Sequence, residues 1–265
     1  MLRMIPSAIE TIFTYPSTDH DMKRITLTLL VCICLPLLGQ TPEQPPDGLQ
    51  IGLVFSPDYC YRMLVATEGD FGAEFVKANR DTLELPRLGF TTGLSLLMKL
   101  GNRLVLESGI LFADMGERTK RMELTYIPPK PERPNAIRRT HHYLYMDVPV
   151  RMNYYFIKKR LAWYVGAGIS AKVALTYRLV ARLEYSDGST ETTSSTDAEL
   201  LKRLNVAATA GMGLSYALSQ CLAIRLEPTF RHAIKPNVDK PIKGYLYSAG
   251  VTVGLLFRPS CRSGT

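Results

Sequence analysis

Long stretches of the chain alternate between apolar and polar residues at every second position. Between His141 and Arg160 the sequence reads HHYLYMDVPVRMNYYFIKKR. One set of alternate positions is apolar or aromatic and comprises Leu144, Met146, Val148, Val150, Met152, Tyr154 and Phe156. The other set comprises Tyr143, Tyr145, Asp147, Pro149, Arg151, Asn153 and Tyr155. Successive side chains of a β-strand point to opposite faces, so this pattern predicts a strand with one apolar and one polar face.

Seven further stretches show the same alternation. The eight predicted strands cover about residues 50–62, 86–99, 103–115, 142–157, 161–177, 203–218, 221–232 and 244–258. Most have 10 or more residues, whereas strands of soluble proteins average about five or six. A tilted strand needs about 9–11 residues to cross a bilayer. Strand length therefore favours a membrane protein.

The connections between these strands alternate in length. Three are short and read LGN, KKR and SQ, and the four long ones are 63–85, 116–141, 178–202 and 233–243. Bacterial outer-membrane barrels have short periplasmic turns and long extracellular loops. A sheet in hydrocarbon must also close, because an open edge leaves backbone groups unpaired. We therefore predict that residues 49–258 form an all-β, eight-stranded, antiparallel up-and-down transmembrane β-barrel, with outer-membrane lipid on its apolar face.

The N-terminal residues have the layout of an export signal. From Met22 the chain has a basic start, an apolar core up to Leu38, and then small and polar residues, as in a secretory signal peptide. We predict a signal peptide over 22–40 and, after export, a location in the cell outer membrane. The flanking segments are interpreted as an upstream extension or a misassigned start (1–21), a proline-rich spacer (41–48) and a periplasmic tail (259–265).

Charge and motifs add little to this picture. The formal net charge is +8, but Lys and Arg are scattered, with longest basic runs at 158–160 and 138–139. We therefore expect no nucleic-acid partner.

The stretch YVGAGISA, residues 164–171, matches a dinucleotide-binding fingerprint, which requires a helix after its glycines. The strand alternation continues through it instead, so these glycines more simply make room inside the barrel, and we expect no cofactor.

The predicted lumen face carries charges of both signs. They are Glu107, Asp147, Arg151, Lys172, Arg225, Glu227 and Arg231. One interpretation is an active site or a selective pore, and the other is a charged plug. An eight-stranded barrel is only wide enough for its own side chains to fill, and charges of both signs neutralise one another in a confined interior. We therefore favour a filled polar lumen.

Candidate catalytic or metal-binding residues are few. His141, His142 and Asp114 lie near the outer ends of predicted strands, and His232 lies at another. No third or fourth metal ligand has a recognisable spacing, and no nucleophile is paired with a base. We expect no metal site and no enzymatic activity, with a barrel-borne hydrolase as an alternative.

Three cysteines follow the predicted signal peptide. The predicted topology places Cys221 and Cys261 at the periplasmic end and Cys60 at the outer end of the barrel. Bridged cysteines have Cα atoms within about 7 Å, so Cys60 is too far away to pair with either. We predict a disulfide between Cys221 and Cys261.

Four segments carry a resemblance to a known family. YLYMDVPVRMNYYF, WYVGAGIS, AGMGLSYAL and YSAGVTVGLLFRP resemble the PorT-like outer-membrane β-barrel family of Bacteroidota over about residues 49–258. The resemblance implies insertion by the outer-membrane assembly machinery, which reads the last strand near Phe257. Some relatives are linked to protein secretion.

The predicted function is a structural or interaction role through the extracellular loops or the periplasmic face. The long loops IPPKPERPNAIRRTHH and EYSDGSTETTSSTDAELLKR either contact a protein or surface ligand or are simply solvated, and the sequence leaves both open. Alternatives are a small-solute pore, the hydrolase mentioned above and a soluble, lipocalin-like ligand carrier. The last would require an apolar interior.

Overall fold

The computed structural model describes residues 48–128, 132–197, 201–237 and 241–259. The elements in chain order are β1 (Leu49–Ala66), α2 (Phe71–Leu83), β2 (Glu84–Lys99), β3 (Leu104–Thr119), β4 (Met122–Glu123), β5 (Ala136–Lys158), β6 (Leu161–Glu184), β7 (Thr190–Asp197), β8 (Leu204–Ala217), β9 (Leu222–Ala233) and β10 (Ile242–Phe257). The predicted extension 1–21, the signal peptide 22–40 and Cys261 fall outside the described residues, as do most of the spacer and the tail.

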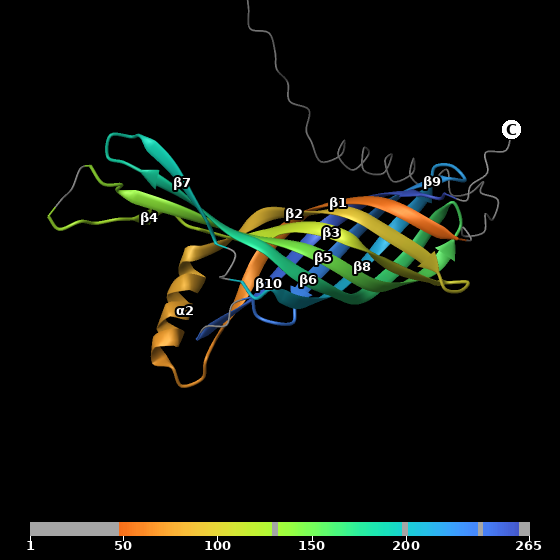
Figure 1. The fold of residues 1–265 in the computed structure, drawn as a ribbon, viewed down its shortest axis with the longest axis horizontal. Coiled ribbons are helices and arrows are strands. Elements are labelled where there is room, and N and C mark those ends of the chain that lie inside the picture. The colour runs from red at the N-terminus through yellow and green to blue at the C-terminus, as the bar shows by residue number, and fades with distance from the viewer. Residues whose placement is uncertain (1–47, 129–131, 198–200, 238–240, 260–265) are drawn as a thin grey trace, which may run out of the picture. The chain divides into compact units, whose positions relative to one another are not determined.

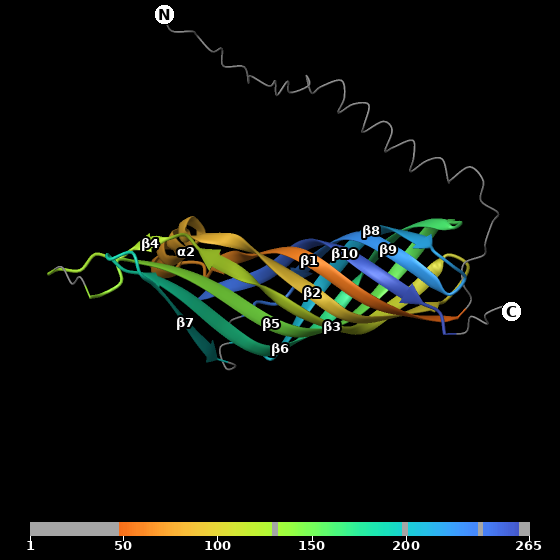
Figure 2. The same cartoon turned by 90° about the horizontal axis from the view of Figure 1, so that it is seen from above.

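Eight of these strands form a closed ring, shown from two sides in Figures 1 and 2. Their order around the ring is β1-β2-β3-β5-β6-β8-β9-β10, with antiparallel pairing throughout. The ring closes where β10 pairs with β1, from Ile51 opposite Phe257 to Ala66 opposite Ile242. The predicted eight-stranded antiparallel barrel is confirmed.

The two faces of the barrel wall are chemically opposite. On β9, Ile224 and Leu226 are 41% and 49% exposed, whereas Arg225 and Glu227 are 1% and 0% exposed. β5 divides in the same way, with Met152 outside and Arg151 inside. An apolar outer surface around a polar interior is typical of a transmembrane barrel. It is the reverse of what a soluble, lipocalin-like carrier requires.

The turns at one end of the barrel are short, as predicted. Residues 100–103, 159–160 and 218–221 join β2 to β3, β5 to β6 and β8 to β9. All the longer connections lie at the opposite end, which we call the outer end. No helix among the described residues is long and apolar enough to cross a membrane.

The outer end is more ordered than the sequence predicts. Three of the four predicted polar loops contain regular structure: α2 lies in 63–85, and β4 and β7 lie in 116–141 and 178–202. β5 and β6 stay paired as far as Ala136 opposite Glu184, and β7 adds to the free side of β6. This ribbon extends beyond the barrel, and α2 lies beside the outer opening (Figure 1). All eight residues of β7 are exposed, so this strand lacks the two different environments whose alternation identifies the spanning strands.

Candidate functional site

An ion-pair group crosses the lumen near the short turns. Arg225 on β9 donates from Nη2 to Glu107 Oε2 on β3 at 2.9 Å and also pairs with Glu227. Strands β3 and β9 are four places apart around the ring in either direction, so this bond spans the barrel. Arg151 on β5 bonds Glu227 and lies 3.8 Å from Glu107. Each carboxylate therefore contacts two guanidinium groups, which compensates for burying it.

The other predicted lumen charges form two separate pairs. Lys172 on β6 lies 2.5 Å from Asp147 on the adjacent β5. Arg231 on β9 donates to Asp58 on β1 at 2.9 Å. All seven predicted residues are thus buried in the lumen, but in three groups. Asp58 is absent from the prediction, although the alternation of the run 50–62 places it on the inner face.

Glycines on neighbouring strands leave space for this group. A Cβ atom on Gly211 of β8 would collide with Glu227 Oε1, and one on Gly213 would collide with the hydroxyl of Tyr164. Tyr164 in turn donates to Glu227 Oε2 at 2.6 Å. Gly166 on β6 has the same role beside Asn153. The YVGAGISA stretch is part of the continuous strand β6, so its glycines serve packing, as expected.

An apolar layer follows toward the outer end. Its buried members are Cys60, Ala113, Met115, Tyr143, Tyr145, Leu201, Ala233 and Leu246. Two spaces within the described lumen measure only about 30 and 10 Å³.

Cys60 is a free, buried thiol in this layer. The predicted disulfide between Cys221 and Cys261 stays a prediction, because Cys261 lies outside the described residues.

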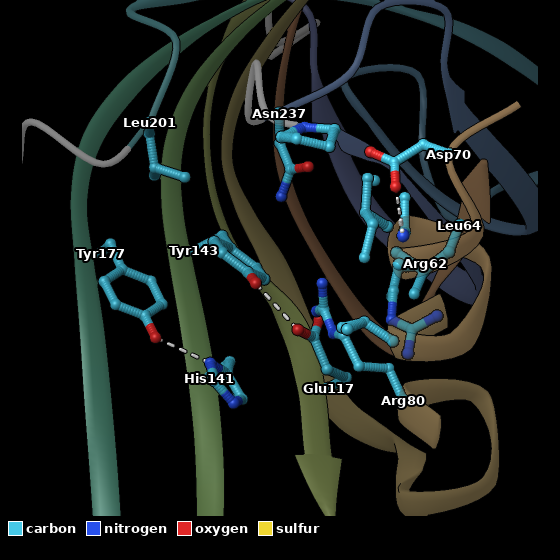
Figure 3. Close-up of a pocket in the computed structure, with 16 residues that line it drawn as sticks. Arg62, Leu64, Asp70, Arg80, Glu117, His141, Tyr143, Tyr177, Leu201 and Asn237 are labelled. Carbon is cyan, nitrogen blue, oxygen red and sulfur yellow. Dashed lines mark hydrogen bonds between the residues drawn. The ribbon is translucent and has the colours of Figure 1, made fainter. Parts of the chain in front are cut away.

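A cavity of about 510 Å³ lies at the outer end, between the barrel wall and α2. Its volume is within the usual range of small-molecule sites. Figure 3 shows Glu117, His141, Tyr143 and Tyr177 from β3, β5 and β6 on one side, and Arg62 with α2 on the other. The apolar part of its lining includes Leu64, Val76, Leu201 and Ile242.

Two buried oxygen atoms in this lining have no hydrogen-bond partner among the residues that the structure describes. Glu117 accepts at Oε1 from the Tyr143 hydroxyl at 2.8 Å, but its Oε2 is unpaired. Asn237 Oδ1 is also unpaired. The two residues are 0% and 4% exposed. Unsatisfied acceptors at such burial are uncommon in proteins, and water, an ion or a ligand can supply the donor.

The ionisation of two cavity residues is shifted by their surroundings. Glu117 and His141 lie beyond the predicted membrane-spanning runs 103–115 and 142–157. Burial, with the neighbouring Glu84 carboxylate, raises the pKa of Glu117 to about 7. Burial lowers the pKa of His141 to about 4. His141 Nδ1 shares a hydrogen bond of 2.7 Å with the Tyr177 hydroxyl, so at neutral pH His141 is an uncharged part of the cavity wall.

Ion pairs attach α2 to the barrel rim beside the cavity. Arg62 Nε on β1 donates to Glu84 at 2.6 Å, and its Nη1 donates to Asp81 at 2.8 Å. Arg80 on α2 donates to Glu84 at 2.7 Å. The N-terminus of the helix is capped by Asp70, whose side chain accepts from the Ala73 amide at 3.0 Å. Apart from Arg62, these residues lie in or beside the predicted loop 63–85, so the alternation did not reveal them.

Of the three residues considered for a hydrolase, Asp114 and His142 meet at the barrel rim, whereas His141 bonds Tyr177. Asp114 lies 3.0 Å from His142 Nδ1. Both Asp114 oxygens also accept from Arg87, at 2.8 Å each. Arg87 further donates to the Met115 carbonyl at 3.1 Å. This bidentate pair joins β2 to β3 beside the register shift between Pro86 and Phe90, which gives Asp114 a structural partner.

Comparison with known proteins agrees with this architecture. A sequence model of the outer membrane protein beta-barrel domain matches residues 61–235. The chain belongs to this family. As an outer membrane β-barrel, the protein resides in the outer membrane, as the strand lengths and turns predict. No curated protein matches the chain.

Solved structures similar to this outer membrane β-barrel include bacterial surface and outer membrane proteins. Neisserial surface protein A is 13% identical, with 80% of this chain and 97% of that chain covered and a TM-score of 0.42. A major outer membrane protein from Thermus thermophilus is 8% identical, with 80% and 100% covered and a TM-score of 0.40. OprG from Pseudomonas aeruginosa is 10% identical, with 80% and 97% covered and a TM-score of 0.34. At these scores no functional argument follows. The narrower PorT-like resemblance stays a prediction.

Proposed function

We propose that this outer membrane β-barrel does not conduct solutes and acts through its structured outer end. The observation that supports this is the bond from Arg225 to Glu107, which joins opposite sides of the ring. The apolar layer around Tyr145 lies between that group and the outer cavity. A pore requires a continuous path for water, and both layers obstruct it.

Conductance in planar bilayers tests this proposal. We expect no large, steady channels from the purified protein, because the ion-pair group and the apolar layer fill the lumen. A porin added to the same preparation verifies that channels are detected. Large and steady channels from the protein alone would favour the small-solute pore.

The proposed role includes contact with anionic groups at the outer surface of the membrane. Arg138 and Arg182 lie directly opposite each other on the ribbon, and the pairing register places Arg118 and Arg178 on the same face. All four are exposed, and this face continues the lipid-facing side of β5 and β6. Like charges directly opposite one another destabilise a sheet. We propose that phosphate groups of outer-leaflet lipids offset this repulsion.

We propose no enzymatic role. The Asp114 carboxylate that would orient His142 is bound on both oxygens by Arg87, which favours a structural use. A link to protein secretion rests on the PorT-like resemblance alone and stays an alternative. Insertion by the assembly machinery rests on the same resemblance, and contact with a protein or surface ligand at the outer loops rests on the composition of those loops; both stay predictions.

A further inference from the structure

The outer cavity combines apolar walls with unpaired acceptors. Leu64, Val76 and Ile242 provide apolar lining from α2 and from the neighbouring strands β1 and β10. Among the described lining residues, Glu117 Oε2 and Asn237 Oδ1 are the buried oxygens without a hydrogen-bond donor. Arg62 Nη2 also forms no hydrogen bond, but it lies 2.5 Å from Glu84 Oε2 in an ion pair. In Figure 3 the Asn237 amide and the Glu117 carboxylate both face the space between α2 and the strands. Mostly apolar pockets with a few convergent polar groups are the usual form of small-molecule sites.

We propose that this cavity binds a small organic amine, with its ammonium group on Glu117 Oε2, a second donor on Asn237 Oδ1, and an apolar chain between them. This inference is independent of whether the lumen conducts. An ammonium group supplies three donors and no acceptor, which matches an unpaired carboxylate oxygen.

The charges around the cavity favour a cation over an anion. Arg62 and Arg80 are paired with the carboxylates of Glu84 and Asp81. Their charge is therefore already balanced before a ligand binds. Glu117 has no ion-pair partner within the described residues, and its neutral neighbour Tyr143 supplies its one hydrogen bond. An anionic ligand would add a second negative charge beside Glu117.

Binding of an amine should depend on the ionisation of Glu117. The ionisable groups around this carboxyl from the surrounding elements are Arg62, Arg80, Glu84, His141, Tyr143, Tyr145 and Tyr177. Burial and Glu84 together hold the pKa of Glu117 at about 7. Below that pH the carboxyl is mostly protonated and must release its proton to bind an ammonium ion. Affinity should therefore rise as the pH increases through the pKa of Glu117 and then level off.

Three probes of equal length test the proposal by titration calorimetry on the full-length protein in a neutral detergent. They are 6-aminohexan-1-ol, hexane-1,6-diol and 6-hydroxyhexanoate, which share a hydroxyl at one end and carry an ammonium, a hydroxyl or a carboxylate group at the other. We expect the amine to bind at least tenfold more tightly than the other two at pH 8. Glu117→Gln should remove this preference and the pH dependence, and Asn237→Ala should weaken amine binding severalfold.

Glu74→Gln is the matched control, because Glu74 is exposed on α2 and does not line the cavity. It should bind as the wild type does. Heat-modifiable gel mobility verifies that each variant forms the closed barrel. The proposal is overturned if no probe binds, if the diol or the acid binds as tightly as the amine, or if folded Glu117→Gln binds the amine like the wild type.

Discussion

At the scale of single residues, the lumen depends on carboxylates that each serve several donors. Glu227 accepts from Arg151, Arg225 and Tyr164, and it is fully buried. Removing it leaves two guanidinium groups with only Glu107 to balance them. Such a buried group is far more sensitive to the loss of one partner than to the replacement of all of them by apolar residues.

Glu227→Ala is therefore expected to destabilise the barrel by about 3–5 kcal/mol, the usual result of breaking a buried ion pair. Urea unfolding in lipid vesicles, followed by tyrosine and tryptophan fluorescence, measures the change. Glu191→Ala on exposed β7 is the control and should alter stability by less than about 1 kcal/mol. Equal stabilities of the two variants would mean that the central group contributes nothing to the fold.

At the scale of elements, sequence and structure agree wherever a strand has two different environments. The runs 142–157 and 221–232 alternate because one face contacts lipid and the other the crowded lumen, and both are strands. The same alternation places Asp58 inside, and the structure shows that it pairs there with Arg231. It does not reveal α2 or β7, since neither element has one face in lipid and the other in the lumen. Asp70, which caps the N-terminus of α2, is a residue type that favours the start of a helix. The interpretation of 63–85 as a long loop did not use this signal.

The cavity illustrates the same limit. Glu117 follows the predicted run 103–115, and Asn237 comes from a connection more than 100 residues later. Only the closure of the ring brings β3 and the β9–β10 connection to the same opening. Their unpaired oxygens are therefore a property of the folded chain and not of any sequence motif.

The extracellular ribbon provides a test at this scale. Replacing Arg138 and Arg182 by Gln should reduce the retention of phosphate-bearing lipids, because each arginine near an anionic surface contributes about 1 kcal/mol. Native mass spectrometry of protein released from nanodiscs containing lipid A measures the lipid retained. Replacing Lys159 and Arg160, at the short-turn end, is the control for loss of charge alone. Undiminished lipid A on the ribbon variant would argue against the proposed contact.

At the scale of the whole molecule, the outer cavity links stability to pH in two opposing ways. Burial and Glu84 raise the pKa of Glu117 from 4.5 to about 7, so its contribution to stability is complete below pH 4.5 and declines as the pH rises to 7. Burial lowers the pKa of His141 from 6.5 to about 4. Its contribution is complete above pH 6.5 and declines as the pH falls to 4. The two effects nearly cancel between pH 4.5 and 6.5.

Single substitutions should separate these effects. Glu117→Gln removes the contribution of Glu117, which declines as the pH rises. The stability of this variant should therefore increase more steeply than that of the wild type from pH 4.5 to 6.5. His141→Gln removes the opposite effect, so its stability should fall relative to the wild type over the same range. Urea midpoints in vesicles at pH 4.5, 5.5 and 6.5 give both differences, and other titrating groups cancel because they are common to all three proteins. If both variants keep the wild-type profile, neither Glu117 nor His141 is buried in the ionisation state that the cavity imposes.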